Sequence, residues 1–195
     1  GVMTVPSDGS VTTAKLGDNA VTTAKITDAN VTSAKMFSGF KNGITEADQW
    51  RLSASLTANV DPISSNLERV DNTGFGYIGT GMSVSSGTWT FPSTGIWSIR
   101  ATADINALPN DNVILYIKIT TDNSTYATVA VLSDSGDGSS TGAGHATTEF
   151  LFNCTDTSTH KVRFTGSSIG SGSSIVGATT YNATFFTFTR LGDST

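Results

Sequence analysis

Apolar side chains recur every five residues through the first part of the chain. Three copies of one ten-residue phrase follow one another, and their apolar positions are Val11, Leu16, Val21, Ile26, Val31 and Met36. On a helix, a step of five residues turns the side chain by about 140°, so these positions form no stripe. On a strand, five is odd, so successive apolar residues face opposite sides. A single chain cannot bury these groups by itself. We therefore predict a fibre shaft over residues 1–36, in which identical chains, most simply three, wrap one axis.

The alternative for residues 1–36 is a flexible, low-complexity linker that happens to repeat. A Gly/Ser linker would not place β-branched or aliphatic residues at both apolar rows, which favours the fibre interpretation. The ten-residue phrase resembles repeats in the fibre proteins of tailed bacteriophages, marine ones especially. This resemblance covers no more than residues 1–36.

A joint is expected between this segment and the rest of the chain, at residues 37–49. Thr45 is a suitable helix N-cap, and Asp48 favours the exposed N–H groups of a first turn, so the sequence predicts a short helix here. From residue 50 the pattern alternates strictly, which predicts a strand with one buried face. Its apolar positions are Trp50, Leu52, Ala54 and Leu56. Pro62 ends this strand.

The remainder of the chain has the pattern of β-structure. Runs rich in Thr, Val, Ile and aromatic residues predict strands at 89–91, 96–105, 113–120, 126–132, 146–152, 161–165 and 181–191. Turn residues separate them at 92–95, 108–111, 121–124, 133–144 and 166–172. Short strands at this spacing, without crossover helices, predict an all-β antiparallel sandwich over residues 50–195. A jelly roll is the version that most readily stacks about a threefold axis.

Two stretches resemble the C1q/TNF-like jelly roll. Residues 87–97 look like that family's pair of Gly-x-aromatic strands, with Trp89 and Trp97 where the family usually has Phe and Tyr. Residues 181–191 are similar to its final aromatic strand. The resemblance implies a homotrimer with both termini at the base and the last strand near the threefold axis. It thereby assigns core or axis roles to four aromatic residues, with Phe186 and Phe188 on one face of the strand and Phe185 with Tyr181 on the other.

Composition narrows the class of protein. The chain has 195 residues, 14% of them charged, and a net charge of −5. No Lys/Arg cluster is available to neutralise phosphates, so no nucleic-acid partner is expected. No apolar run approaches the roughly 18 residues of a membrane span, and no signal peptide is visible, so no membrane insertion is expected. The single cysteine, Cys154, excludes an internal disulfide and favours intracellular assembly.

Several strings imitate motifs of catalysis or ligand binding. Residues 74–79 fit Gly-x-Gly-x-x-Gly, but no helix is predicted after them to hold a pyrophosphate. Residues 166–170 fit Gly-x-Ser-x-Gly, but they lie in a Ser/Gly loop and not in a strand-to-helix elbow. His145 and His160 lie in separate segments, and residues 134–138 lack the alternating oxygen ligands of a calcium loop. We expect no catalytic residue, no cofactor and no metal.

These features favour a structural and adhesive protein. We expect the trimeric distal part of a bacteriophage fibre, on the tail or the capsid, assembled in the host cytoplasm and carried on the virion. Its partners would be other virion proteins upstream and a host cell-surface glycan or protein. Two other classes stay open, a secreted C1q-like adhesin and a fibre-borne polysaccharide depolymerase. The depolymerase requires two carboxylates about 5 to 9.5 Å apart across a groove. The available acids occur singly, mostly in turns: Asp104, Asp111, Asp122, Asp134, Asp137, Glu149 and Asp156.

The resemblance also suggests where a partner binds. In the implied jelly roll, the links 121–124, 155–159 and 177–180 are expected at the tip farthest from the termini. Short polar groups there suit the hydroxyl groups of a sugar, and loops on a rigid scaffold commonly carry binding residues. The candidate contacts are Asp122, Asn123, Asp156 and Thr157. The alternatives are that these links are ordinary solvated turns, or that the partner binds the longer loop 133–144, expected on the flank.

Overall fold

The computed structural model describes residues 7–9, 11–12, 14, 16–18, 20–27, 30–32, 35–36 and 43–195. The chain divides into two compact units, residues 1–41 and residues 42–195. Residues 37–42 of the expected joint lie outside the described ranges.

The repeat forms a series of short turns, each closed by a backbone hydrogen bond between residues three positions apart. The N–H donors and C=O acceptors are Ala20 to Gly17, Lys25 to Thr22, Asn30 to Thr27 and Lys35 to Thr32, at 2.9 to 3.0 Å. One of these turns includes the 3₁₀ turn η2 (Thr23–Lys25). A single apolar residue separates each turn from the next: Val21, Ile26 and Val31. The five-residue apolar period therefore coincides with a five-residue period of turns.

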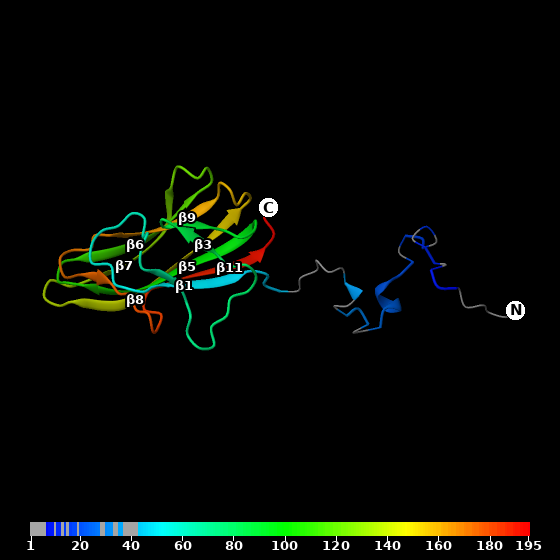
Figure 1. The fold of residues 1–195 in the computed structure, drawn as a ribbon, viewed down its shortest axis with the longest axis horizontal. Helices are drawn as coiled ribbons and strands as arrows, with labels where there is room; N and C mark the ends of the chain where they lie inside the picture. Colours follow the sequence, from blue (N-terminus) through cyan, green and yellow to red (C-terminus); the bar gives the residue numbers. More distant parts are fainter. Residues whose placement is uncertain are drawn as a thin grey trace. The chain divides into compact units, whose positions relative to one another are not determined.

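Residues 43–195 contain a sandwich of two antiparallel sheets (Figure 1). In the first sheet the strands run in the order β8, β5, β11, β1, β2, and β10 extends the sheet beside β5. Their bounds are β1 (Ala47–Leu52), β2 (Leu67–Arg69), β5 (Gly95–Ala107), β8 (Gly142–Cys154), β10 (Ser174–Ile175) and β11 (Phe185–Gly192).

The second sheet has the order β3, β4, β9, β6, β7. Its strands are β3 (Ser83–Ser85), β4 (Thr88–Thr90), β6 (Asn112–Thr120), β7 (Ala127–Ser135) and β9 (Lys161–Ser167). All strand pairs within the named strands of both sheets are antiparallel. The chain crosses repeatedly between the sheets, as in a jelly roll: β1 and β2 lie in the first, β3 and β4 in the second, β5 in the first, β6 and β7 in the second, β8 in the first, β9 in the second, and β10 and β11 in the first. The predicted all-β antiparallel jelly-roll sandwich is thus confirmed.

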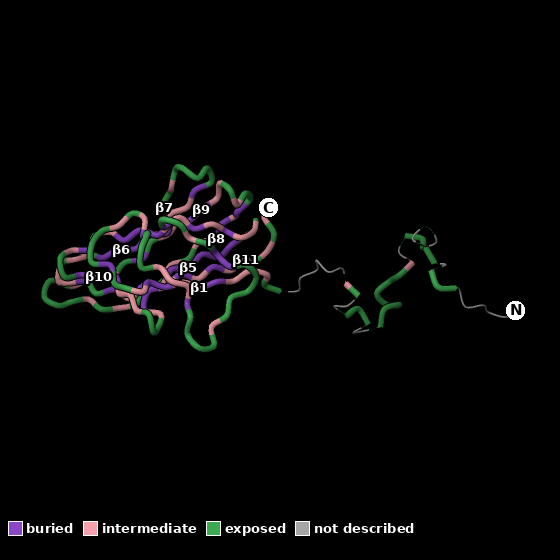
Figure 2. Tube along the Cα trace, in the orientation of Figure 1, coloured by how far each residue is buried: buried purple, intermediate pink, exposed green. Residues whose placement is uncertain are grey.

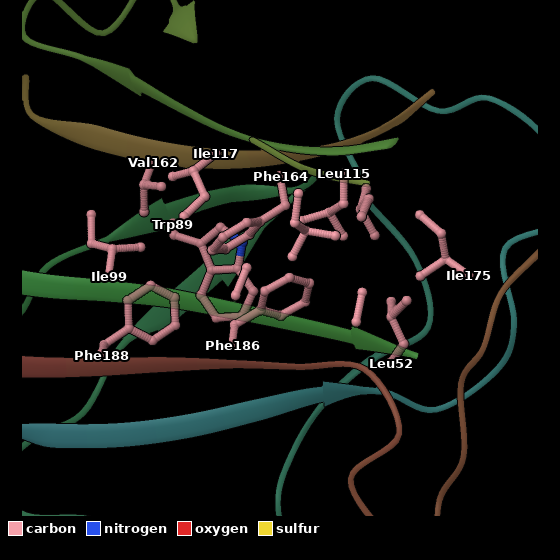
Figure 3. Packing of buried hydrophobic residues seen from close by; sticks show 14 of the residues in the cluster. Leu52, Trp89, Ile99, Leu115, Ile117, Val162, Phe164, Ile175, Phe186 and Phe188 are labelled. Atoms are coloured by element: carbon pink, nitrogen blue, oxygen red, sulfur yellow. The ribbon is translucent and has the colours of Figure 1, made fainter. Parts of the chain in front are cut away.

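Alternation along the strands builds the core between the sheets. In β5 every second side chain from Trp97 to Ala107 is buried, while Arg100 and Asn106 are exposed. Trp89 of β4 lies at the centre of an aromatic cluster with Phe164 of β9 and Phe186 of β11 (Figure 3). Its ring centroid is 5.9 Å from that of Phe164 and 6.1 Å from that of Phe186. This cluster joins the two sheets through their inner faces.

The start of the sandwich differs from the expectation. No helix follows Thr45, because β1 begins at Ala47 and pairs with β11 over the positions expected to be helical. Sheet pairing supplies long-range backbone bonds that outweigh a local capping preference. Arg51 is fully buried although the alternation placed it on the solvent face.

Strand boundaries also differ from those predicted. The last strand begins at Phe185, so Tyr181 lies in the preceding link. The loop expected at 133–144 narrows to 136–141, because β7 continues to Ser135 and β8 begins at Gly142. The two- and three-residue strands β2, β3 and β10 carry too little pattern to be predicted.

Candidate binding surfaces

One end of the sandwich holds both the entry and the exit of the chain. Gly95, at the start of β5, pairs with Cys154, at the end of β8. β11 ends beside the same part of β5, antiparallel to the start of β1. The Asn153 side-chain N–H donates to the C=O of Thr195 at 3.1 Å. The β8–β9 link at 155–160 therefore lies at the terminal end.

The β6–β7 link also lies at this terminal end. Thr120, the last residue of β6, pairs with Lys161, which directly follows the link 155–160. The expectation that Asp122, Asn123 and the 155–159 link occupy the tip is therefore wrong. In this strand order the β4–β5, β6–β7 and β8–β9 links all share one end, and β11 finishes there as well.

Asp122 hydrogen-bonds within its own turn. Its Oδ1 accepts from the Thr120 hydroxyl at 2.7 Å and from the N–H groups of Ser124 and Thr125 at 2.8 Å each. These bonds, that from Thr120 foremost, hold the pKa of Asp122 well below its ordinary value. The next residue, Asn123, has a φ of 56°, a left-handed conformation that Asn adopts more readily than most residues. Asp122 therefore stabilises a tight turn.

Asp156 has a similar arrangement. Its Oδ1 accepts from the hydroxyl of Ser158 at 2.7 Å and from the N–H of Ser158 at 2.8 Å, and these bonds lower its pKa. The C=O of Thr157 accepts from Lys161 Nζ at 2.6 Å. The candidate contacts from the sequence thus belong to two turns at one end of the sandwich, and internal hydrogen bonds engage Asp122, Asp156 and Thr157.

At the opposite end of the sandwich, the loops are hydrogen-bonded to one another. The N–H of Gly136 donates to the C=O of Asp111 at 3.1 Å, and the hydroxyl of Ser173 donates to the Asp111 carboxylate. An ideal Cβ on Gly136 would lie 2.2 Å from the C=O oxygen of Leu108, so this close approach requires glycine. The loop 136–141 therefore lies at the far end and not on the flank. The link 177–180, which leads towards the start of β11, lies towards this end as expected.

The outward face of the first sheet combines polar rows with exposed apolar side chains. Phe186 and Phe188 are fully buried in the core, whereas Phe185 points to the outer face and is half-buried. Leu151 and Leu191, also on this face, are 57% and 56% exposed. Tyr181, 58% exposed, precedes the strand. Phe185, Leu151 and Leu191 give this face an apolar component that the single chain leaves uncovered.

A row of paired polar residues crosses the same face. Gln49, Thr187, Arg100 and Glu149 lie opposite one another in neighbouring strands. Gln49 Nε2 donates to the Thr187 hydroxyl at 2.9 Å, and Arg100 lies 3.5 Å from Glu149. Glu149 also accepts from the Ser98 hydroxyl at 2.6 Å.

Buried ionic groups, which the sequence did not predict, fasten the edge at β1 and β2. Asp48, 4% exposed, accepts from the indole N–H of Trp50 at 2.8 Å and from the N–H of Met82 at 2.8 Å, and it pairs with Arg69. Arg51 pairs with Glu68 and with Asp71. In the sequence, Asp48 is assigned to a helix start and Arg51 to the solvent face of the following strand, so neither pattern indicates burial.

A groove of about 460 Å³ runs beside this ionic cluster. The guanidinium of Arg69 lies 4.8 Å from the ring centroid of Trp50 and 4.7 Å from that of Tyr77. The same guanidinium donates to Asp48 and to the C=O of Met82. Arg69 thus anchors the segment 77–82.

A smaller, more polar hollow of about 280 Å³ lies on the outward face of the second sheet. Asp61 accepts from Lys118 Nζ at 2.6 Å and from the Thr165 hydroxyl at 2.7 Å. The bond from Lys118 is the main cause that lowers the pKa of Asp61. Asn59 and Tyr116 also line the hollow. No candidate from the sequence lies here, because the lining residues come from segments far apart in the chain.

The acids considered for an enzyme have local partners. Asp104 lies 3.7 Å from His145, and Asp134 and Asp137 accept backbone N–H groups of the β7–β8 hairpin. In the part of the chain that the structure describes, no three His, Cys, Asp or Glu side chains gather as a metal site requires. Within those residues, no helix has the length and apolarity to cross a membrane.

Burial differs sharply in the repeat (Figure 2). Its apolar side chains are exposed, at 56% for Val11, 48% for Leu16, 58% for Val21, 39% for Ile26 and 54% for Val31. Met36 is partly exposed. The single chain therefore leaves all these described apolar positions at least partly open to solvent.

Neither the comparison with protein-family models nor the search of curated proteins finds a match for this chain. Solved structures do match. Murine APRIL at pH 5.0 aligns with a TM-score of 0.54 at 9% identity, over 75% of this chain and 98% of that one. Eiger TNF from S. frugiperda aligns with a TM-score of 0.55 at 10% identity, over 78% and 96%. The PRD1 vertex protein P5 aligns with a TM-score of 0.49 at 17% identity, over 77% of this chain and 100% of that one. A TM-score at this level supports no inference.

Identities this low establish the fold alone. The sandwich is a TNF-like jelly roll, in agreement with the resemblance drawn from residues 87–97 and 181–191.

Proposed function

We propose that this chain is the distal, adhesive part of a bacteriophage fibre, a homotrimer carried on the virion and joined to other virion proteins upstream. The repeat forms a three-chain shaft, and the jelly roll forms a head that attaches to a glycan or protein of the host cell surface. The molecule works by assembly and binding, without catalysis. Assembly takes place in the host cytoplasm.

The exposed apolar row of the repeat carries this proposal. Five of its side chains are 39% to 58% exposed, and each described turn satisfies backbone groups without burying any of them. Fully burying a Val, Leu or Ile side chain stabilises by about 1.5 to 3 kcal/mol. Ordering a backbone residue costs about 1 to 2 kcal/mol. Three chains around one axis would bury the apolar row and offset that cost.

The outward face of the first sheet supports self-association of the head. Leu151, Leu191 and Phe185 lie there among polar and paired charged side chains, a composition that suits a contact between copies. Closed rotational symmetry is the commonest arrangement for identical chains.

Two measurements test the proposal. Sedimentation equilibrium at micromolar concentration should give three times the chain mass of 20.2 kDa, and a single-chain mass would contradict it. Purified protein should also adsorb to whole bacterial cells and compete with phage adsorption. A trimer that binds no cell in a screen of bacterial strains would support a fibre without an adhesive role.

A further inference from the structure

The hollow on the second sheet has the chemistry of a small binding site. It is lined by strands β6 and β9 and by the segment 59–61, which runs beside β9 where Val60 pairs with Gly166. Its volume of about 280 Å³ falls just below the roughly 300 to 1,000 Å³ of sites for larger small molecules. A ligand the size of one sugar residue therefore suits it.

Apolar and aromatic surface lies at one side of the hollow. Tyr116 stands between Val131 and Thr165 in neighbouring strands, and all three point outward. Val131 is 53% exposed, and Tyr116 is partly exposed. The C–H face of a pyranose is apolar, so a tyrosine ring beside a valine offers it a suitable surface.

Polar groups lie at the other side. The Asp61 carboxylate accepts from Lys118 and Thr165, and it keeps acceptor capacity because its side chain is 55% exposed. Asn59 Oδ1 accepts from the N–H of Ile169 at 2.8 Å. Among the described residues, nothing hydrogen-bonds to the Asn59 NH₂ group or to the Tyr116 hydroxyl. A ligand with several hydroxyl groups would meet donors and acceptors together.

Charge narrows the ligand class. The charges of Lys118 and Asp61 offset one another at 2.6 Å. Arg163, whose charge also acts on Asp61, lies over the Tyr126 ring at 3.9 Å and donates to the Thr88 hydroxyl at 2.9 Å. The hollow thus presents no free cation to an acidic sugar, which favours a neutral one.

We propose that this hollow, lined by Asn59, Asp61, Tyr116, Lys118 and Thr165, binds one neutral pyranose residue of a glycan. The trimer contact proposed above uses the first sheet, so the second sheet remains open for the glycan. The inference rests on the proposed function only in assigning that glycan to a host surface.

Full-length protein provides the test, with methyl glycosides of glucose, galactose, mannose and N-acetylglucosamine as probes and methyl glucuronide as the charged counterpart. Saturation-transfer-difference NMR should detect at least one neutral glycoside. Tyr116→Ala should weaken its binding at least tenfold, and Asp61→Asn combined with Lys118→Met should do the same. Tyr77→Ala, which removes an exposed tyrosine outside the hollow, should leave sugar binding unchanged.

Tyr116→Phe keeps the ring and the packing, so it remains informative where the alanine variant does not fold, and it should weaken binding severalfold. Absence of binding by every neutral glycoside, binding by the glucuronide alone, or full binding by both Tyr116 variants would overturn the inference. Cell adsorption is scored separately. If the parent trimer adsorbs to cells and the Tyr116→Ala variant adsorbs equally well, the proposed function stands. Only the assignment of the hollow as the glycan site then fails.

Discussion

The repeat and the sandwich treat their apolar side chains in opposite ways. In the sandwich, Trp89, Ile99 and Phe186 are completely buried, whereas Val21 in the repeat is 58% exposed. The sandwich achieves burial by pairing strands that are far apart in sequence, such as β1 with β11. Backbone bonds of the repeat instead join residues only three positions apart. Without long-range pairing, the described residues of the repeat have no second layer to cover their apolar groups, and for this reason we propose that other copies cover them.

The last strand of the sandwich provides the strongest test of this difference in burial. Phe186→Ala should lower the free energy of unfolding by about 3 to 5 kcal/mol, because it empties a fully buried aromatic site. Phe185→Ala, on the outer face of the same strand, should cost much less in unfolding and act mainly on trimer content. Denaturant unfolding and sedimentation measure the two effects. Equal effects of both variants on unfolding would contradict the assignment of faces.

The buried ionic cluster offers a second way to test the sandwich. Asp48→Ala should cost about 2 to 3 kcal/mol, because it leaves Arg69, the Trp50 indole and a backbone N–H without their acceptor. Partial exposure of Arg69, at 32%, keeps the cost from being larger. Asp71→Ala, which removes a 78% exposed partner of Arg51, is the control and should cost far less. Comparable losses in the free energy of unfolding for the two variants would indicate that burial does not determine the strength of these ionic interactions.

The repeat side is tested by placing charges on its apolar row. Val21→Asp with Ile26→Asp should open the shaft and expose residues 1–41 to protease, without changing the melting temperature of the head. The matched control, Thr22→Asp with Thr27→Asp, adds the same charge at neighbouring polar positions and should leave protease resistance unchanged. Equal cleavage of the two variants would favour the flexible-linker interpretation.

The smallest expected effect concerns pH and Asp122. Folding lowers the pKa of this carboxyl from its ordinary 3.8. Its contribution to the stability of the folded state is therefore complete above pH 3.8 and disappears as the pH falls through the pKa of the folded state. Asp122→Ala should therefore lower the melting temperature slightly at pH 6, and the difference from the parent protein should shrink below about pH 3.8. A difference that grows with acidification would show that the turn does not depend on the ionised carboxylate.

Strand positions could be predicted from the sequence because alternation survives wherever one face is buried. β5 and β6 show this, since their inward residues are apolar and their outward residues are mostly polar. Asp48 and Arg51 could not be placed in this way. Each is buried only because a distant segment, at 68–82, folds over it and supplies an ionic or backbone partner.

The position of the loops could not be predicted from strand pattern alone. Whether Asp122 lies at the terminal end depends on the order of strands in both sheets, which individual strand patterns do not encode. The hollow at Asp61 and Tyr116 could not be predicted for the same reason, because its residues meet only after β6 pairs with β9 and Val60 pairs with Gly166. Local pattern specifies elements, while sites arise from how the elements are joined.

The turns of the repeat have a consequence for how such a protein can change over generations. The bond from Ala20 to Gly17 recurs at Asn30 and Thr27, and the bond from Lys25 to Thr22 recurs at Lys35 and Thr32. Duplicating one ten-residue unit therefore lengthens the segment while keeping every later apolar side chain in phase. Inserting a single residue shifts all later ones out of phase. The length of the segment can thus vary in whole ten-residue units while the sandwich keeps its sequence.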